Sequence, residues 1–394
     1  MNLRPKPTTL LLAAFFSGVL AAQAQLTIPS DGSDGAFNPA TNVEIDLGLA
    51  TNGLWNSPGS GNGVYDAEKW AVVFKYSSVN IPAGVSVTFK NHPAYAPVVW
   101  LVQGNVTIDG ELNLDGKSGV SDTVGGLLPT EPGPGGFRGG ARGATVSGHG
   151  YGPGGRGFYG RYATIYGNPQ IIPLIGGSGG YSAFGKSGAA GGGAIAIFAS
   201  NTISIDGLVT AGTKETQPEI IGSGGAVRLV ANLVQGTGQV RCATTFTNTN
   251  YAPVTSDSFG RIRIEANSLN SSLQTLPETI GVSPPNTPII WPAANAPTAK
   301  VISVDSVNAP LDPRAPLVAG ADVAIQNSNQ VNILIETTNF PIEGVVQLNI
   351  TPKFGNRTTH TATRLSGDIT SATWQVQTTL PQGFVTLQAR ATQP

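Results

Sequence analysis

The sequence has very little cysteine, methionine, histidine or charge. Its 394 residues include one cysteine, Cys242, one methionine, Met1, and three histidines. A single cysteine excludes an internal disulfide, and it also excludes a cysteine-based zinc module or an iron–sulfur cluster. The stability of the chain must therefore come from packing and hydrogen bonding.

Charged residues make up 11% of the chain, with 22 Lys and Arg against 23 Asp and Glu. A typical soluble domain has roughly a quarter. A charge balance near zero argues against a nucleic-acid partner, which is bound by neutralising phosphates. Hydrophobic residues still make up 40% of the chain, enough to bury a core. The abundant residues are glycine, with 52, and proline, with 29.

The first 24 residues have the pattern of a signal peptide. Arg4 and Lys6 precede an apolar run at 10–19, and Ala22 and Ala24 form a small-x-small cleavage site. An uncleaved anchor is the alternative, but the run is shorter than the about 20 residues that span a bilayer. No later segment is long and apolar enough, so we expect no transmembrane segment in the mature chain. The predicted location is secreted, extracellular or at the cell surface.

One sequence phrase recurs along the chain. Residues 98–110 are echoed at 194–207, more weakly at 226–236, and as a fragment at 261–267. Each full echo is a short β run, an asparagine, and a second β run closed by glycine. Such units of roughly 20–30 residues are typical of a β-solenoid. We therefore expect an all-β chain with an irregular right-handed parallel β-solenoid (β-helix) over 25–276, with a β-sandwich or barrel as the alternative.

Composition and residue pattern define three further segments. Residues 116–193 form an insert with 27 glycines in 78 residues, and residues 277–297 form a Pro-rich linker that we expect to be extended. Residues 298–394 carry strands with a period of two, such as the one in which Trp374 alternates with Val376. This length and pattern predict an Ig-like β-sandwich, although the cysteine pair of antibody domains is missing.

These motifs carry a resemblance to a family. The repeat phrase, Ile-Pro-Ala-Gly-Val at 81–85, the glycine clusters and Gly-Gly-Ala-Val-Arg-Leu at 224–229 resemble Gly-rich β-helix-like secreted bacterial surface proteins. Such proteins often carry Ig-like modules. More distantly, the chain is similar to pectate-lyase-type β-helices and adhesin passenger domains. The resemblance implies the fold and an exported location, and it brings no catalytic residues.

The insert interleaves aromatic and basic side chains. Flat rings suit sugars, and guanidinium groups offer paired donors to a carboxylate or sulfate. We therefore expect contact with extracellular polysaccharide or a cell surface; the alternative is an inert packed loop. The candidate binding residues are Arg138, Arg142, Tyr151, Arg156, Phe158, Tyr159, Arg161 and Tyr162.

Asp31 and Asp34 are candidate metal ligands. They lie in the sequence Ser-Asp-Gly-Ser-Asp-Gly at 30–35, whose alternating oxygens could bind Ca²⁺. Calcium takes six to eight oxygen ligands, and two carboxylates alone do not supply them. A plain turn is the alternative, and no other cofactor is predicted.

No residue set identifies a reaction. Asp109 and Asp206 recur in Asp-Gly pairs, which could line a groove but are also common turns. Residues 176–180 match the nucleophile pattern Gly-x-Ser-x-Gly, yet no helix start follows them. The predicted function is a structural or adhesive surface protein. The alternative, a polysaccharide lyase or glycoside hydrolase of the β-helix type, needs the following residues to converge: Asp109, Asp206, Arg228, Arg241 and Glu265.

Overall fold

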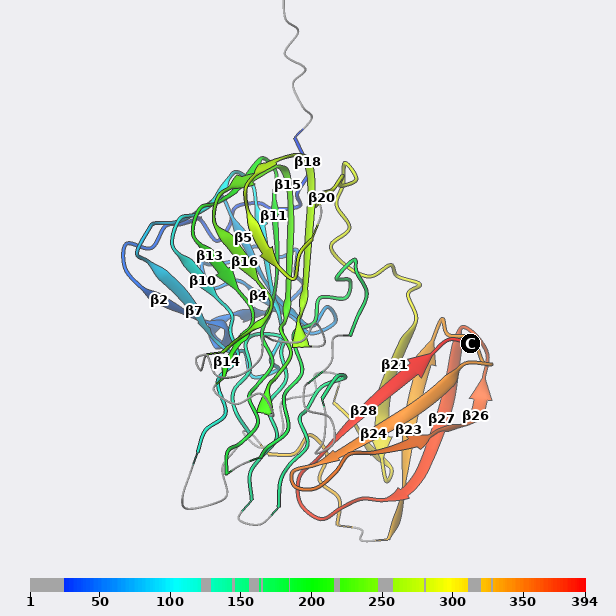
Figure 1. Cartoon of the computed structure of the whole chain (residues 1–394). Coiled ribbons are helices and arrows are strands. Elements are labelled where there is room, and N and C mark those ends of the chain that lie inside the picture. Colours follow the sequence, from blue (N-terminus) through cyan, green and yellow to red (C-terminus); the bar gives the residue numbers. More distant parts are fainter. Residues whose placement is uncertain are drawn as a thin grey trace, which may run out of the picture.

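The structure, a computed structural model, is nearly all β (Figure 1). It describes residues 25–121, 129–143, 146–155, 163, 166–183, 185–215, 220–246, 258–279, 281–310, 320–326 and 329–394. The predicted signal peptide lies outside these residues. Helix in the described chain is limited to short segments such as the 3-10 helix η1 (Leu47–Leu49).

The recurring phrase forms a parallel ladder. In it, β5 (Ala71–Tyr76), β8 (Val98–Val102), β11 (Ala194–Ala199), β15 (Ala226–Gly236) and β18 (Arg261–Ser271) pair in that order, all parallel. Register partners Val72 and Val98 are 26 residues apart, and the next steps are 97, 32 and 35 residues. The long step contains the Gly-rich insert.

The ladder belongs to a curled 12-stranded sheet. The first half of β15 pairs with β11 and its second half with β12, so two lines of strands join into one bent sheet. The other strands of this sheet are β1 (Ala36–Phe37), β3 (Thr51–Asn52), β4 (Val64–Asp66), β6 (Ser78–Ile81), β9 (Val106–Ile108), β12 (Thr202–Ile205) and β20 (Gly281–Val282). We use the word rung for one stretch of the chain that adds one strand to each of the stacked parallel lines of strands.

A second parallel sheet closes the opposite side of the rungs. Its order is β19 (Gln274–Leu276), β16 (Gln239–Arg241), β13 (Leu208–Thr210), β10 (Glu111–Asn113), β7 (Ser86–Lys90) and β2 (Val43–Asp46). A further parallel pair is β14 (Thr213–Glu215) with β17 (Thr244–Phe246). Alternate side chains of both sheets fill one core between them, such as Trp100 and Leu229 from the first sheet and Val209 from the second.

The asparagines of the phrase stack between rungs. Asn201 donates to Asn105 at 2.8 Å, and Asn267 donates to Asn232 at 3.0 Å. Equivalent positions of successive echoes thus lie side by side, as amide ladders do in stacked parallel strands. The expectation of parallel β structure built from these echoes is confirmed.

The described part of the insert consists of extended segments that hydrogen-bond to several neighbours at once. Residues 188–193 donate through backbone N–H groups to three different segments in turn. The bonds are Gly188 to Gly140, Ala189 to Ile220, Ala190 to Lys117, Gly191 to Phe137, Gly192 to Ser223 and Gly193 to Leu114, at 2.8–3.0 Å. A period of three residues, with every bond made to another segment, is the geometry of a polyproline II helix.

Glycine is required because these segments nearly touch. A Cβ atom at Gly139, Gly179 or Gly191 would lie 1.9 Å from a backbone carbonyl oxygen of the adjacent segment. No side chain fits at that distance, as at the crowded axis of collagen. The glycine clusters of the sequence therefore specify a packed bundle of backbone, which we call the glycine bundle.

The C-terminal part has two antiparallel sheets. One has the order β22 (Val307–Asn308), β21 (Thr298–Val304), β23 (Gln330–Thr338), β27 (Ser371–Thr379) and β26 (Thr363–Gly367); the other has β25 (Thr358–Thr361), β24 (Val345–Pro352) and β28 (Val385–Thr392). Ile333, Leu348 and Trp374 share a core separate from that of the rungs. Trp374 is buried and donates to Thr337 Oγ1 at 2.9 Å, which confirms its predicted core position.

The Pro-rich segment between the two parts lies against the first of them. Pro284 and Pro288 are buried, and the Trp291 ring meets the Trp55 ring edge-on with centroids 5.6 Å apart. Trp291 also packs on an apolar cluster that includes Phe198 on the outer side of the parallel ladder. These contacts fix residues 284–291 on the rungs.

Candidate functional site

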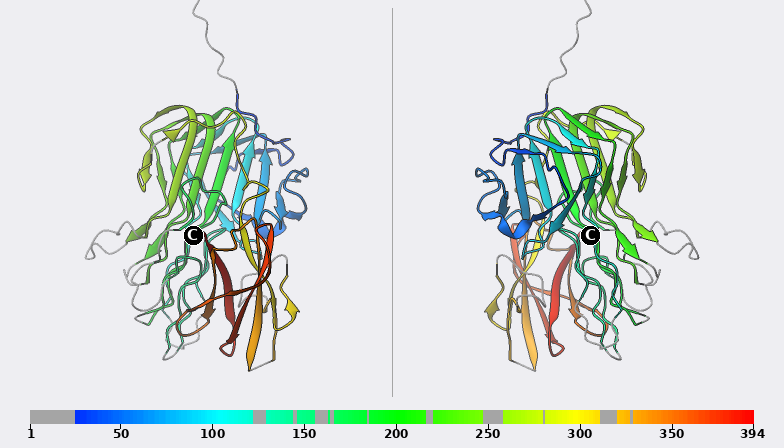
Figure 2. Two further views of the ribbon diagram at one scale, coloured as in Figure 1. Left: turned by 90° about the vertical axis from the view of Figure 1, so that its right-hand side faces the viewer. Right: turned by 90° about the vertical axis from the view of Figure 1, so that its left-hand side faces the viewer.

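The glycine bundle extends from one end of the rungs and meets the C-terminal part, as two further views show (Figure 2). Arg357, in the loop between β24 and β25, donates to the carbonyl oxygens of Gly150, Gly152 and Gly155 at 3.2, 2.9 and 3.3 Å. Its Nε donates to Thr351 Oγ1 at 2.9 Å. Burial lowers the pKa of this guanidinium to about 10, so it is still charged at neutral pH.

Backbone contacts reinforce this junction. The Gly355 N–H donates to the Ser147 carbonyl at 2.9 Å, and Gly148 forms a parallel bridge with Gly355. A Cβ at Gly143 would come within 3.3 Å of the Phe354 ring. The tip of the insert is thus held by the C-terminal part.

Arg138, a predicted binding residue, is buried inside the insert. It pairs with Glu131 Oε2 at 2.6 Å, donates to the Pro129 carbonyl at 2.8 Å and donates to the Tyr95 hydroxyl. Its guanidinium carbon lies 5.0 Å from the centre of the Tyr95 ring. These contacts join the insert to the second rung, so the structure places Arg138 as an anchor rather than on the surface.

The other predicted binding residues fall into two groups. Tyr151 is buried, which raises its pKa to about 12, and its N–H donates to the Arg138 carbonyl at 3.1 Å. Arg142 is half-buried and donates to the Gly185 carbonyl. The remaining five lie outside the described residues: Arg156, Phe158, Tyr159, Arg161 and Tyr162.

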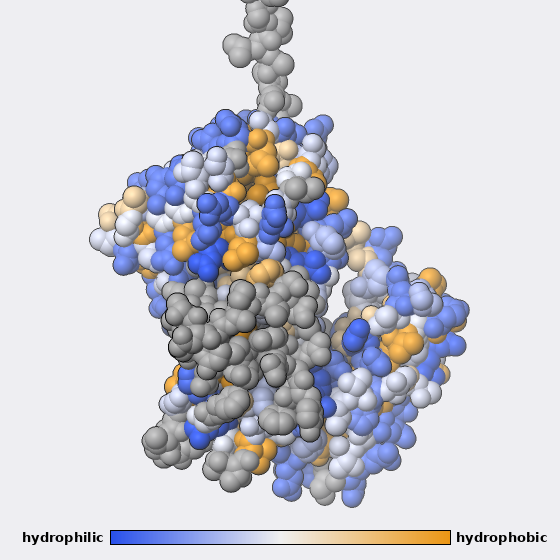
Figure 3. Space-filling view, viewed as in Figure 1, coloured by the Kyte–Doolittle hydropathy of each residue, from blue (hydrophilic) through white to orange (hydrophobic). Residues whose placement is uncertain are grey.

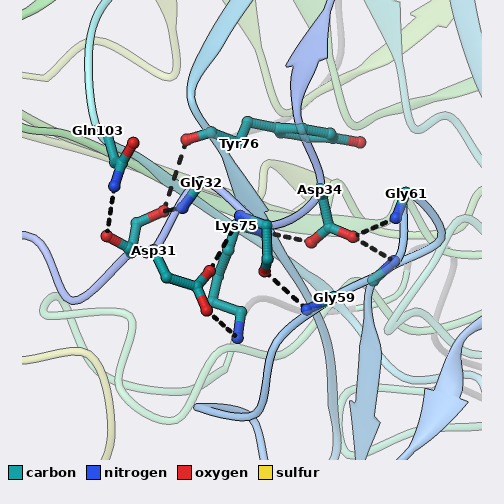
Figure 4. A network of polar contacts seen from close by, with 11 residues as sticks. Asp31, Gly32, Asp34, Gly59, Gly61, Lys75, Tyr76 and Gln103 are labelled. Carbon is teal, nitrogen blue, oxygen red and sulfur yellow. Dashed lines mark hydrogen bonds and ion pairs between the residues drawn. The ribbon is translucent and has the colours of Figure 1, made fainter.

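Asp31 and Asp34 belong to a polar network at the first rung (Figure 4). Asp34 accepts the backbone N–H groups of Gly61, Gly63 and Lys75 at 2.8, 3.1 and 2.7 Å. Asp31 Oδ2 lies 3.6 Å from the buried Lys75 Nζ. Donors thus occupy oxygens that Ca²⁺ would need. Among the described residues, no group of three or more His, Cys, Asp or Glu could hold a metal ion.

The environment of Asp31 favours its charged form. Partial desolvation raises its pKa, but hydrogen bonds from Ser33 and the charge of Lys75 outweigh that effect, and the net pKa lies below the ordinary value. Lys75 is fully buried, and among the described residues its ammonium has no hydrogen-bond partner besides this ion pair. The two predicted metal ligands therefore hold the N-terminal loop against β5.

The residues that a catalytic groove would need lie in three places. Glu265 Oε1 accepts from Arg228 Nε at 2.8 Å and from Arg263 Nε at 2.7 Å, in a buried ion network on the outer side of the ladder. Asp206 accepts from Thr237 at 2.9 Å at a turn of the stack, with Asp109 on the adjacent rung. Arg241 lies in the six-stranded sheet.

The other residues that the sequence motifs singled out make structural contacts. Ser178, from the Gly-x-Ser-x-Gly match, is fully buried in the glycine bundle, and its Oγ accepts the Gly154 N–H at 2.9 Å. His92 stacks on Tyr65 with ring centroids 3.9 Å apart. His149 contacts the Gly150 carbonyl, and His360 lies in β25. The three histidines thus lie in three different regions of the structure.

The sequence analysis missed Arg357, Tyr95 and Arg263, which make central polar contacts. No local pattern marks Arg357 or Tyr95, because their partners are distant in sequence: Arg357 lies 202 to 207 residues from the glycines that it binds, and Tyr95 lies 43 residues from Arg138. Arg263 bonds to Glu265, only two residues away, but nothing in the sequence shows that this pair joins the buried Arg228. A useful signal would have been a lone arginine in a loop of an otherwise weakly charged module.

The comparisons with known proteins add nothing to the family resemblance, which depends on the sequence motifs alone. No family model matches this sequence, and searches of the curated proteins and of the solved structures found no match. Within the described residues, no helix has both the length and the apolar character needed to cross a membrane.

Proposed function

We propose that the chain is an exported structural or adhesive surface protein that contacts polysaccharide through the tip of its Gly-rich insert. Its rungs belong to a β-solenoid, and its C-terminal part is an Ig-like module that supports the insert. The parallel register of the echoes supports the solenoid. The two antiparallel sheets around one core support the Ig-like module, and the pattern of residues 1–24 supports export.

The observation that carries the proposal is the construction of the insert. Backbone hydrogen bonds hold its glycine segments, and Arg138 and Arg357 anchor it at two sides. A loop held in this way loses little further conformational entropy when it binds a ligand. A free linker would not offer this advantage.

Two half-buried cations lie near each other on this support. Arg142 donates to the Gly185 carbonyl, and Lys186 follows in the same turn, where its N–H donates to Ala183 at 2.8 Å. Arginine beside a second cation suits carboxylate or sulfate groups. An acidic polysaccharide is therefore the ligand class that we expect, with the predicted aromatic residues of the insert adding contact to the sugar rings.

A glycan array tests the proposal with the mature chain, residues 25–394. We expect binding to uronic or sulfated glycans, and a loss of at least about tenfold in affinity in Arg142→Gln/Lys186→Gln, since each charged contact contributes about 1.5–3 kcal/mol. The matched control is Lys90→Gln/Lys300→Gln, at exposed lysines on other elements. Equal binding by both variants, or no glycan bound at all, would refute the proposal. Release of shortened glycans would instead favour the alternative function, a polysaccharide lyase or glycoside hydrolase.

A further inference from the structure

Two arginines of the last two rungs lie directly opposite each other on the outer face of the parallel ladder. Arg228 of β15 and Arg263 of β18 are register partners, and each alternates with residues whose side chains fill the core. Like charges directly opposite each other on adjacent strands destabilise a sheet. The pair therefore needs negative charge close by.

Glu265 supplies one negative charge for these two positive ones. Its Oε1 lies 2.8 Å from Arg228 Nη2 and 2.7 Å from Arg263 Nε. It is the only acidic residue of β15 and β18. The segments that accept hydrogen bonds from the arginines of this face, residues 166–176 and 281–291, contain no Asp or Glu. One guanidinium charge thus remains in excess.

The surroundings of this excess charge are largely apolar. Arg228 is buried, with its guanidinium carbon 5.2 Å from the centre of the Phe198 ring. Burial lowers the pKa of Arg228, and the charge of Arg263 lowers it further, although Glu265 raises it. In the space-filling view, hydrophilic residues interrupt a hydrophobic area on the face where β18 and β20 lie (Figure 3). An anion beside such a charge interacts with it more strongly than it would in water.

The arginines of β18 have donors available on this face. Within the described residues, the Arg263 guanidinium makes one hydrogen bond, through Nε, so both Nη groups can donate to a ligand. Its side chain is 26% exposed. Arg261, two residues earlier on the same face, donates to the backbone carbonyls of Tyr166 and Gly167 at 2.9 and 3.0 Å. These three residues line a small hollow at the surface.

We propose that Arg263 and Arg261 form a binding site for an oxyanion, namely a carboxylate or sulfate group. Such groups match the paired N–H donors of a guanidinium. The bound anion is the second counter-charge of the opposed arginines Arg228 and Arg263. It comes either from a free inorganic ion or from the acidic group of a sugar. The site uses other residues than Arg142 and Lys186, so this inference is independent of the carbohydrate-binding proposal.

Isothermal titration calorimetry of the mature chain with sodium sulfate, at constant ionic strength, tests the proposal. We expect saturable binding, and we expect Arg263→Gln to weaken it about tenfold or more, because a charged hydrogen-bonding partner is lost. The matched control is Arg390→Gln, at an exposed arginine of β28, which should bind sulfate as the wild type does.

Titration with glucuronate and with an oligomer of glucuronate distinguishes the two sources of the anion. Equal affinity for each acidic group indicates a site for a free anion. Tighter binding of the oligomer, again weakened by Arg263→Gln, indicates a site for an acidic sugar chain.

Stability measurements separate an anion site from a purely structural role of Arg263. In chloride, Arg263→Gln removes the repulsion and keeps the Arg228–Glu265 pair, so urea unfolding should show a variant at least as stable as the wild type. Sulfate should stabilise the wild type more than the variant, because a ligand of the folded state adds its binding free energy. The general effect of sulfate on protein surfaces is common to both proteins.

Three results would overturn the proposal. The first is the absence of saturable sulfate binding to the wild type. The second is a loss of binding in Arg390→Gln as large as that in Arg263→Gln. The third is a loss of stability in Arg263→Gln that is equal in chloride and in sulfate, since Arg263 would then act only as a structural partner of Glu265.

Discussion

At the residue scale, the glycines of the insert act through the absence of a side chain. Gly179 lies so close to Arg138 that an added Cβ would be 1.9 Å from the Arg138 carbonyl oxygen. The same segment donates from Gly179 N–H to the Tyr151 carbonyl at 3.0 Å. A methyl group cannot be accommodated without separating segments that share backbone bonds.

Gly179→Ala should therefore destabilise the fold by about 3 kcal/mol, in the range of overpacked cores. Urea unfolding followed by circular dichroism measures the change. Gly53→Ala is the control, because its Cβ would meet only Val64 Cγ1 and Ser57 Oγ at 3.6 Å and 4.0 Å, which is ordinary contact. Equal stability of the two variants would show that the bundle is not close-packed.

The ion pair between Asp31 and Lys75 combines a half-exposed carboxylate with a buried ammonium. Asp31→Asn should destabilise the protein by about 1–2 kcal/mol, since it leaves a buried charge with a weaker partner. Asp46→Asn, in the exposed pair with Lys90, should cost less than about 1 kcal/mol. Thermal unfolding at pH 7 compares the two, and similar losses would contradict the assigned role.

The pH dependence of this pair has a defined sign. The folded pKa of Asp31 is lowered, so its contribution to stability is complete above the ordinary carboxyl value of about 4 and is lost as pH falls through the folded pKa. Asp31→Asn should flatten the acid side of the stability curve. A curve as steep as that of the wild type would indicate that other carboxylates dominate.

At the scale of elements, the sequence predicted the parallel strands well and the insert poorly. The echoes were visible because alternating apolar residues and a terminal asparagine repeat, and β11 pairs with both β8 and β15 as that repeat indicates. Register within the insert could not be predicted, since a glycine segment has no side chains that distinguish one neighbour from another. The burial of Arg138 and Tyr151 could not be predicted either, because aromatic rings and cations in a glycine-rich stretch suit an exposed binding surface and a buried anchor equally.

The junction at Arg357 is the element-scale contact that sequence did not reveal. Arg357→Ala removes the donors to three carbonyls of the insert and should weaken the junction by about 2–4 kcal/mol. Calorimetry should then resolve two unfolding transitions for the variant, whereas the wild type should show one. Arg364→Ala is the control, because within the described part of the chain this exposed arginine side chain donates only to the Gly367 carbonyl, in its own hairpin. Identical calorimetric traces for the two variants would exclude a coupling role.

At the scale of the whole molecule, the two largest hydrophobic cores of the described residues lie in different parts of the chain. The core around Ile333 and Trp374 contains only residues of the C-terminal part. Residues 298–394 expressed alone should therefore unfold cooperatively, and Trp374→Ala in that fragment should cost about 3–5 kcal/mol. Thermal melting measures both. Broad, non-cooperative melting would show that the fragment depends on its contacts with the insert.

The 97-residue step between the second and third rungs also bears on how such a chain can change over evolutionary time. The strands on both sides of the insertion keep their register partners, so the pairing of the ladder does not depend on the length of the segment inserted between them. Closing a loop three times longer than its neighbours costs only about 1 kcal/mol, because the entropy penalty grows with the logarithm of length. Adding material at this position is thus nearly neutral for the scaffold. The stack tolerates diversification there, and new surface chemistry can be acquired without redesigning the core.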